Sequence, residues 1–268
     1  MVKDAGLRNN SRCMIDDEAF AGEIFKRVRP FLPASFEVLT DRVPVPSQAR
    51  YDPQAAAKAG TDPAVIDFAR AEKGTLYLEG INERMRILRY SGSEEYFKPH
   101  RDGTYVRRGA HPTKAHDLSL LTLHVYLNEG YVGGATRLIE GGFGEPDDAW
   151  KRAKLSSCDV PARQGSVLVF SHDIMHQGAP LAPQKEAEEV WEAARLSGLL
   201  GGGEVDQAAV VASEKALGLC PGDLAAAADR LSEATPPVQV KYSMRSDIMF
   251  TMVPARAASL SPPSSTSS

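Results

Sequence analysis

Short apolar runs, separated by turn residues rather than by helices, fill the centre of this chain and limit what it can fold into. Four runs are rich in β-branched or aromatic residues and are bounded by Gly, Asn or Pro: 85–92, 118–128, 133–140 and 165–172. A longer run of the same character follows at 238–252. Several strands without helices between them are typical of an all-β sandwich or barrel. We therefore expect a mainly β core.

An amphipathic pattern precedes these strands. Apolar residues at positions 20, 24, 25, 28 and 31 recur at three- and four-residue spacing, which predicts a helix with one buried face. Asp16 or Asp17 can cap its start, and Pro30 and Pro33 would end it. Residues 41–62 are rich in Pro, Ala and Asp and favour a loop with a short helix.

The composition changes between residues 184 and 236. This stretch is rich in Ala, Leu and Glu, which favour helices, and its 10 acidic and 4 basic residues give it a net charge of −6. The whole chain carries −4, so the other residues carry +2. We interpret the stretch as an insertion into a single domain at 13–253, either a lid or substrate-docking element or a solvated, partly disordered excursion. The Ser- and Pro-rich tail at 254–268 is expected to be disordered.

Charge and cysteine content argue against several functional classes. The acidic balance provides no global basic field for nucleic acid. Cys13, Cys158 and Cys220 lie far apart, which argues against a disulfide framework or a Cys-rich zinc module. No apolar run approaches the roughly 18 residues that span a bilayer, and the N-terminus lacks an apolar signal core. We expect a cytoplasmic protein with no nucleic-acid or membrane partner.

His100 and Asp102 form the only His-x-Asp pair of the chain. Residues two apart on a strand point to one face, so the pair can offer an imidazole and a carboxylate to one metal ion, although a solvated polar loop is the simpler interpretation. A third ligand is available in His176, just after the run at 165–172, with His172 as its rival. Two histidines and one carboxylate with open positions form the facial triad of non-haem Fe(II) oxygenases.

An oxygenase of this type needs a second electron source, and 2-oxoglutarate supplies it. Its 1-carboxylate and keto oxygen chelate the iron, and its distal carboxylate needs a buried cation. Lys241 and Arg245 lie four apart on one strand face, about 13 Å from each other, so only one can bind that carboxylate. Each also suits an ordinary surface charge. His124, in the middle of the run at 118–128, suits either a core histidine or a pocket-lining one.

Four sequence blocks, in this order, resemble the prolyl 4-hydroxylase-like group of Fe(II)/2-oxoglutarate-dependent dioxygenases. They are RMRILRYSGSEEYFKPHRDG, LSLLTLHVYLNEGYVGGATRLIE, GSVLVFSHDIMHQGAP and KYSMRSDIMF. They cover roughly residues 80–180 together with 238–252. The resemblance implies a double-stranded β-helix, or jelly-roll, with flanking helices: the helix near the N-terminus and the inserted helical segment. The iron would lie in its open mouth.

The resemblance also implies roles for individual residues. His100, Asp102 and His176 match the iron ligands, and Lys241 matches the cation for the distal carboxylate, with Arg245 as the fallback. The remaining residues implied for the cosubstrate pocket are Tyr90, Tyr126, Thr122 and His124. Two features depart from the group's pattern. The spacing from His176 to Lys241 is 65 residues instead of about ten, and the counterpart of His124 is usually apolar.

The activity implied is hydroxylation of an unactivated C–H bond, for example in a prolyl residue of a protein or peptide, with release of succinate and CO2. The cofactors implied are Fe(II), 2-oxoglutarate as cosubstrate and ascorbate as reductant, and the partners are O2 and a small-molecule, protein or peptide substrate. A cupin-like jelly-roll that binds a metal or small molecule without catalysis is the alternative. It would leave Lys241, Tyr90 and Tyr126 without a joint purpose.

Basic residues flank the His-x-Asp pair. They would attract an acidic peptide or a carboxylate substrate, unless they are ordinary outward-facing charges. These residues are Arg84, Arg86, Arg89, Lys98, Arg101, Arg107, Arg108 and Lys114.

Overall fold

The computed structural model of this chain describes residues 7–38, 74–105, 107, 117–140, 156–202 and 204–254. The strands are β1 (Ser11–Asp16), β2 (Ser35–Val38), β3 (Gly74–Ile81), β4 (Arg84–Ser91), β5 (Phe97–His100), β6 (Leu118–Tyr126), β7 (Thr136–Ile139), β8 (Ser157–Val160), β9 (Val167–Ser171), β10 (Met175–Gly178) and β11 (Val240–Pro254). The helices are α1 (Glu18–Val28), the 3-10 turn η1 (Arg29–Phe31), α5 (Gln184–Leu196), α6 (Gln207–Leu217) and α7 (Asp223–Ala228).

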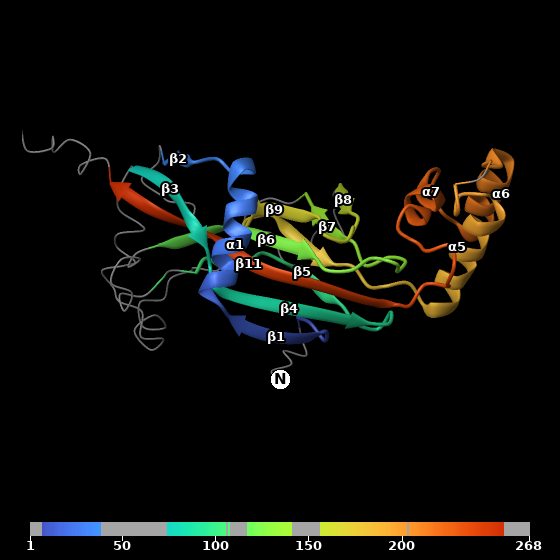
Figure 1. The fold of residues 1–268 in the computed structure, drawn as a ribbon, viewed down its shortest axis with the longest axis horizontal. Helices are drawn as coiled ribbons and strands as arrows, with labels where there is room; N and C mark the ends of the chain where they lie inside the picture. Colours follow the sequence, from blue (N-terminus) through green and yellow to red (C-terminus); the bar gives the residue numbers. More distant parts are fainter. Residues whose placement is uncertain are drawn as a thin grey trace, which may run out of the picture.

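β11 is the central strand of a seven-stranded antiparallel sheet (Figure 1). On one side, residues 240–245 pair with β4 and residues 248–254 pair with β3. On the other side, residues 243–250 pair with β6. β1 continues the sheet beyond β4, β2 beyond β3, and β9 beyond β6. The run predicted at 238–252 is therefore a strand that joins three others.

A smaller antiparallel sheet of four strands lies against the larger one, in the order β5-β10-β7-β8. Side chains connect the two: the Tyr126 hydroxyl on β6 donates a hydrogen bond to Thr136 Oγ1 on β7 at 2.7 Å. The expectation of a mainly β protein with few helices is confirmed in this form. The jelly-roll arrangement itself stays a prediction.

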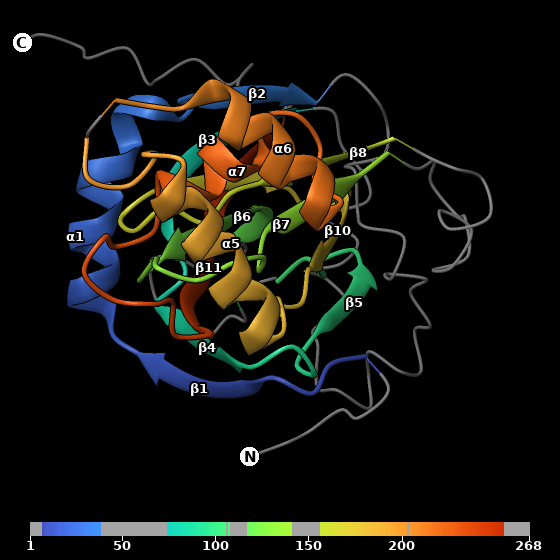
Figure 2. The same ribbon diagram turned by 90° about the vertical axis from the view of Figure 1, so that its right-hand side faces the viewer.

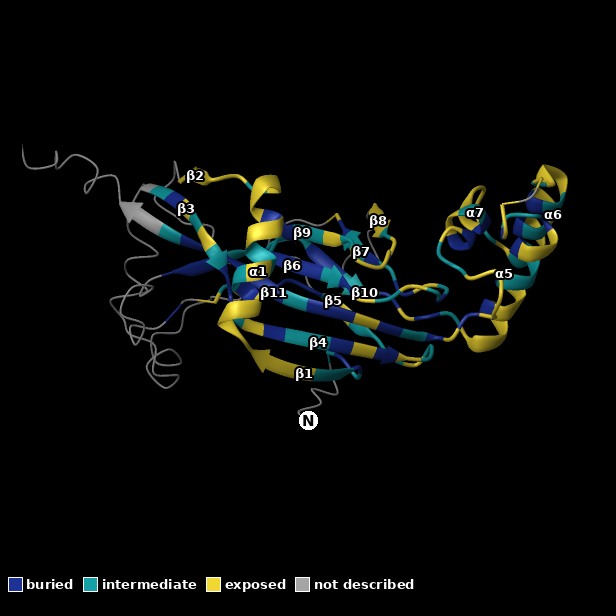
Figure 3. Cartoon of the chain, in the orientation of Figure 1, coloured by how far each residue is buried: buried dark blue, intermediate teal, exposed yellow. Residues whose placement is uncertain are grey.

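The outer face of the seven-stranded sheet packs against α1. Met244, Ile248 and Phe250 alternate along β11 on this face and form an apolar core with Ala21 and Val28 of the helix. Figure 3 shows β11 buried or half-buried over most of its described length, because both of its faces are covered. One face of β11 therefore packs against α1. The residues between these apolar ones point to the other face, toward the smaller sheet.

The helix forms where its pattern predicts. Asp17 is the N-cap, and its side chain accepts a hydrogen bond from the Phe20 backbone N–H at 2.9 Å. The helix continues into η1, whose second residue is Pro30. Phe20 and Phe31 are exposed, contrary to the expectation of a uniformly buried stripe. The helix covers the sheet with Ala21 and Val28, and with the partly buried Ile24 and Phe25.

The stretch predicted as a helical insertion contains α5, α6 and α7, which lie at the end of the sheets where β11 begins (Figures 1 and 2). Its helices pack on one another around an apolar cluster of their own. The buried members of this cluster are Val190, Ala194, Leu200, Val210, Leu224, Ala227 and Ala228. A solvated, partly disordered excursion does not fit this packing.

None of the helices in the described ranges is long and apolar enough to cross a membrane. The loop expected at 41–62 and the tail from 255 onward lie outside the described residues.

Replacing residues 184–236 with a short Gly/Ser linker should leave the two sheets folded, because these helices bury their apolar residues mainly against one another. The ends of the segment lie together: the Gln184 side chain donates to the Pro237 carbonyl at 3.0 Å. The circular dichroism spectrum should lose helical signal while the thermal transition stays cooperative. Removing α1 in the same way is the control and should prevent folding. An insoluble shortened protein would instead place 184–236 in the core.

Candidate metal centre

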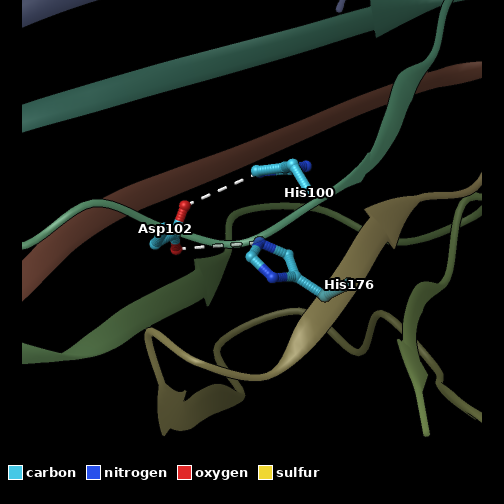
Figure 4. Close-up of side chains that lie close together, drawn as sticks. All are labelled: His100, Asp102 and His176. Atoms are coloured by element: carbon cyan, nitrogen blue, oxygen red, sulfur yellow. Dashed lines mark ion pairs between the residues drawn. The ribbon is translucent and has the colours of Figure 1, made fainter. Parts of the chain in front are cut away.

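Three buried side chains that can bind a metal meet between the two sheets (Figure 4). His100 is the last residue of β5, His176 lies on the adjacent β10, and these two residues are direct partners in the β-ladder. Asp102 follows β5 by two residues. Its carboxylate oxygens lie 3.6 Å from His100 Nε2 and 3.7 Å from His176 Nε2. All three ligand atoms lie within 4.8 Å of one another, a spacing that one ion can bridge.

Backbone carbonyls orient both imidazoles. His100 Nδ1 lies 2.7 Å from the Lys98 carbonyl and His176 Nδ1 lies 3.0 Å from the Ile174 carbonyl. A carbonyl can only accept, so each Nδ1 carries the proton and each Nε2 keeps a free lone pair facing Asp102. The buried Nε2 of His100 finds no hydrogen-bond partner among the described residues. This is the tautomer that a metal ligand requires.

The charge states also suit a cation. Burial lowers the pKa of His100 to about 3 and lowers the pKa of His176, so both rings are neutral at pH 7. Burial alone would raise the pKa of Asp102, but nearby Arg245, the two histidines and a hydrogen bond from Thr122 hold it well below its usual value. Two neutral imidazoles and one carboxylate are therefore ready without loss of a proton.

Asp102 has two partners on the opposite sheet. The Thr122 hydroxyl on β6 donates a hydrogen bond to Oδ2, and Arg245 Nη2 on β11 lies 2.7 Å from Oδ1. These contacts fix the carboxylate from behind, as partners of metal ligands commonly do. The resemblance implied that Thr122 lines the cosubstrate pocket, and that Arg245 is the fallback anchor. In the structure both contact Asp102.

Lys241 is a fully buried cation at the start of β11. Its ammonium donates to the Gly134 carbonyl at 2.6 Å and lies 5.1 Å from the ring centroid of Tyr90 and 5.5 Å from that of Tyr126. No carboxylate of the described residues forms an ion pair with it. Burial lowers its pKa to about 7. A buried lysine without a counter-ion is costly, and this one is suited to an anion that the protein does not itself supply.

Two glycines permit the close packing around this lysine. Gly134 has a φ of +68°, and a Cβ there would lie 2.8 Å from Leu181 Cδ2 and 3.4 Å from the Lys241 side chain. A Cβ on Gly178 would lie 2.8 Å from the hydroxyl of Tyr90. A side chain at Gly134 or Gly178 would therefore displace Leu181 or Tyr90 beside the lysine.

Between Lys241 and the histidine pair lie two buried polar groups that lack partners in the described part of the chain. Ser243 comes between Lys241 and Arg245 on the inner face of β11, and its hydroxyl is unpaired. His124 comes between Thr122 and Tyr126 on β6, and its Nε2 is unpaired. Burial and then the charge of Lys241 lower the pKa of His124 well below its usual value. A neutral hydrogen-bonding strip thus connects the lysine with the metal ligands.

His172, the rival third ligand, faces another group. Its Nε2 lies 3.8 Å from Asp247 Oδ1, and neither ring nitrogen has a hydrogen-bond partner among the described residues. Asp247 is itself buried and its Oδ2 accepts from Asn82 and pairs with Arg86, each at 3.3 Å. The sequence analysis predicted no site role for Asn82 or Asp247, whereas His172 was the rival ligand and Arg86 one of the flanking basic residues. The alternation along β11 after Lys241 is the signal that could have found Asp247.

The metal ligands can be tested by metal analysis of dialysed protein under anaerobic conditions. The protein should bind one Fe(II), and His100→Ala and His176→Ala should each weaken binding more than about a hundredfold, because even loss of a partner behind a ligand costs 10–100-fold. His172→Ala is the matched control, since it removes an equally buried imidazole. Loss of iron in that variant, with retention in His176→Ala, would make His172 the third ligand.

Stability should fall with acidification, because burial lowers the pKa of His100, His124, His172 and His176. Below about pH 6.5 the unfolded chain binds protons that the folded protein resists, down to about pH 3 for His100. At each pH in this window, the free energy of unfolding should drop by about 1.4 kcal/mol per pH unit for every histidine that is still neutral in the folded protein. Urea denaturation across this range measures the slope. The substitution His124→Phe should lower the slope of unfolding free energy against pH by the contribution of one proton, about 1.4 kcal/mol per pH unit. An unchanged slope would mean that His124 is protonated in the folded protein.

Comparisons with known proteins found matches only among solved structures. No protein-family model matches the chain, and no curated protein matches it. A viral collagen prolyl hydroxylase from Paramecium bursaria Chlorella virus-1 is 14% identical, with 91% of this chain and 80% of that one covered and a TM-score of 0.36. A Pseudomonas putida prolyl-4-hydroxylase is also 14% identical, covering 91% and 94%, with a TM-score of 0.28. HygX from Streptomyces hygroscopicus, with iron bound, is 13% identical, covering 89% and 82%, with a TM-score of 0.26. The structures that this chain resembles thus include prolyl 4-hydroxylases and other 2-oxoglutarate–Fe(II) oxygenases.

Proposed function

We propose that this protein is an Fe(II)- and 2-oxoglutarate-dependent dioxygenase on a double-stranded β-helix, which hydroxylates an unactivated C–H bond. One observation carries the proposal: a fully buried lysine without a counter-ion shares an interior with two neutral histidines and an ionised aspartate. A metal-binding protein needs the three ligands but has no use for the lysine. A dicarboxylate cosubstrate needs both.

Each residue then has a part. His100, Asp102 and His176 would hold Fe(II), which would supply the activation of O2. Succinate and CO2 would be the coproducts formed from 2-oxoglutarate. Lys241 would bind the distal carboxylate of 2-oxoglutarate. Arg245 is less suited to that task, because it contacts Asp102 itself at 2.7 Å, beside the ligands. Lys241 lies four residues earlier on the strand, about 13 Å away.

The groups between the two ends of the cosubstrate suit its binding. The unpaired hydroxyl of Ser243 and Nε2 of His124 can hydrogen-bond 2-oxoglutarate along its length. Tyr90 and Tyr126 flank the ammonium group with their rings and keep water from it. Because the apo pKa of Lys241 is about 7, binding of an anion would raise it and secure the charged form.

The cupin-like alternative predicts metal binding without turnover of 2-oxoglutarate. Succinate formation from 2-oxoglutarate, with Fe(II), O2 and ascorbate as the expected reductant, separates the two.

The prolyl residue of a peptide and a free small molecule both offer the C–H bond that such an enzyme attacks. We place the enzyme in the cytoplasm, in keeping with its three free cysteines.

Lys241→Met should raise the Michaelis constant for 2-oxoglutarate more than about a hundredfold, because removing one partner of a buried ion pair costs roughly 3–5 kcal/mol. Iron binding should change little, since the lysine contacts no ligand. Lys185→Met is the matched control, because its ammonium is exposed. A constant that is unchanged in Lys241→Met and strongly raised in Arg245→Met would move the anchor to Arg245.

A further inference from the structure

If the proposed function holds, one buried cation near the candidate metal centre, Arg245, has a close carboxylate partner that would also be a metal ligand. Fe(II) with Asp102 and the 1-carboxylate of 2-oxoglutarate is neutral, and Lys241 is neutralised by the distal carboxylate. Arg86 is paired with Asp247 at 3.3 Å. Arg245 remains. Its ion pair at 2.7 Å is with Asp102, whose charge the metal would then share.

Arg245 has an unused hydrogen-bond donor. Its Nε is buried and finds no hydrogen bond within the described ranges, and its second carboxylate neighbour, Asp247 Oδ1, lies 3.8 Å away, beyond hydrogen-bond distance. The guanidinium fork can bind a carboxylate through two nitrogens at once. A buried guanidinium whose close carboxylate partner would also bind the metal, and whose Nε has no hydrogen bond, therefore favours an anionic group of the molecule that reacts there.

A hydrogen-bond acceptor lies unused beside it. Asp247 is 2% exposed and its Oδ2 is held by Arg86 and Asn82, but its Oδ1 has no hydrogen bond. The 3.8 Å separations from His172 Nε2 and from Arg245 Nη2 leave Oδ1 facing groups that it does not touch. A donor such as an amino or hydroxyl group can satisfy this oxygen. Folded proteins rarely leave several neighbouring buried polar atoms without a hydrogen bond to protein, ligand or water.

We propose that Arg245 binds the carboxylate of the substrate and that Asp247 Oδ1 accepts a hydrogen bond from an amino or hydroxyl group next to that carboxylate. The substrate is then a small free acid of the amino-acid or hydroxy-acid class. This inference rests on the proposed function. The small free acid is favoured over the acidic side chain of a peptide because Asp247 and His172 are almost completely buried and Arg245 is only 15% exposed.

The experiment uses the full chain loaded with Mn(II), which is redox-inert, and saturated with 2-oxoglutarate. Calorimetry measures binding of L-amino acids and 2-hydroxy acids of four to six carbons, their neutral amides, and end-blocked peptides that contain Glu. With Fe(II) and O2, the same probes are tested for stimulation of succinate formation. We expect free acids to bind at least tenfold more tightly than their amides or the peptides. Acids with an amino or hydroxyl group should bind more tightly than unsubstituted ones.

Arg245→Gln should raise the dissociation constant of the best acid by roughly ten- to a hundredfold. Arg245→Lys keeps the positive charge but loses the two-nitrogen fork. Its dissociation constant should lie between those of the unaltered protein and of Arg245→Gln. Arg89→Gln is the matched control, because Arg89 is an exposed residue of β4. Asp247→Asn should abolish the preference for an amino or hydroxyl group. The comparison of acid with amide is made in the unaltered protein, so it stands even if a variant does not fold.

Two failures can be told apart. If the protein binds neither Mn(II) nor 2-oxoglutarate, the proposed function falls and this inference with it. If it binds both, but amides or peptides bind as well as free acids, the enzyme proposal stands and the assignment of Arg245 is wrong. Acid binding that is unaffected in Arg245→Gln overturns the assignment as well.

Discussion

The pairing of β11 with three other strands is the constraint on which the rest of this structure depends. Because β11 is flanked along most of its length, its side chains have no choice of face. Alternate residues enter the core against α1, and the residues between them enter the space between the sheets. That second set is Lys241, Ser243, Arg245 and Asp247. A slip of one residue would exchange the two sets, placing three ionisable groups against α1 and apolar side chains at the metal ligands.

The space between the two sheets contains buried charged and polar groups without partners, and these groups lower the stability of the fold. A lysine with no anion, a histidine nitrogen with no donor and an aspartate oxygen with no hydrogen bond all cost free energy in the folded state. The apolar contacts on the other face of the sheet offset that cost. The site thus lies on one face of the large sheet and this apolar core on the other, with strands such as β4 and β11 contributing residues to both.

Local patterns in the sequence predicted most of the elements but not their neighbours. The periodicity from Phe20 to Phe31, with its Asp17 cap, predicted α1, and the apolar runs predicted β4, β6, β7, β9 and β11. The strands β1, β2, β3, β5, β8 and β10 were not predicted as elements, although His100 and His176 on two of them were named from spacing and resemblance. The contact of Thr122 with Asp102 and the pairing of Arg86 with Asp247 depend on which strands become neighbours. Spacing along the chain does not contain that information.

The order of the strands along the chain has a consequence for biosynthesis. β3, β4 and β6 all leave the ribosome before the strand that joins them, and α5, α6 and α7 are made in between. Until β11 follows, each of the three strands presents an unpaired edge, which is where nascent β proteins associate wrongly. The helices have mostly local contacts and can form early, whereas closure of the large sheet spans well over a hundred residues and must be slow. The cosubstrate pocket therefore comes into being in one late step, together with the sheet itself.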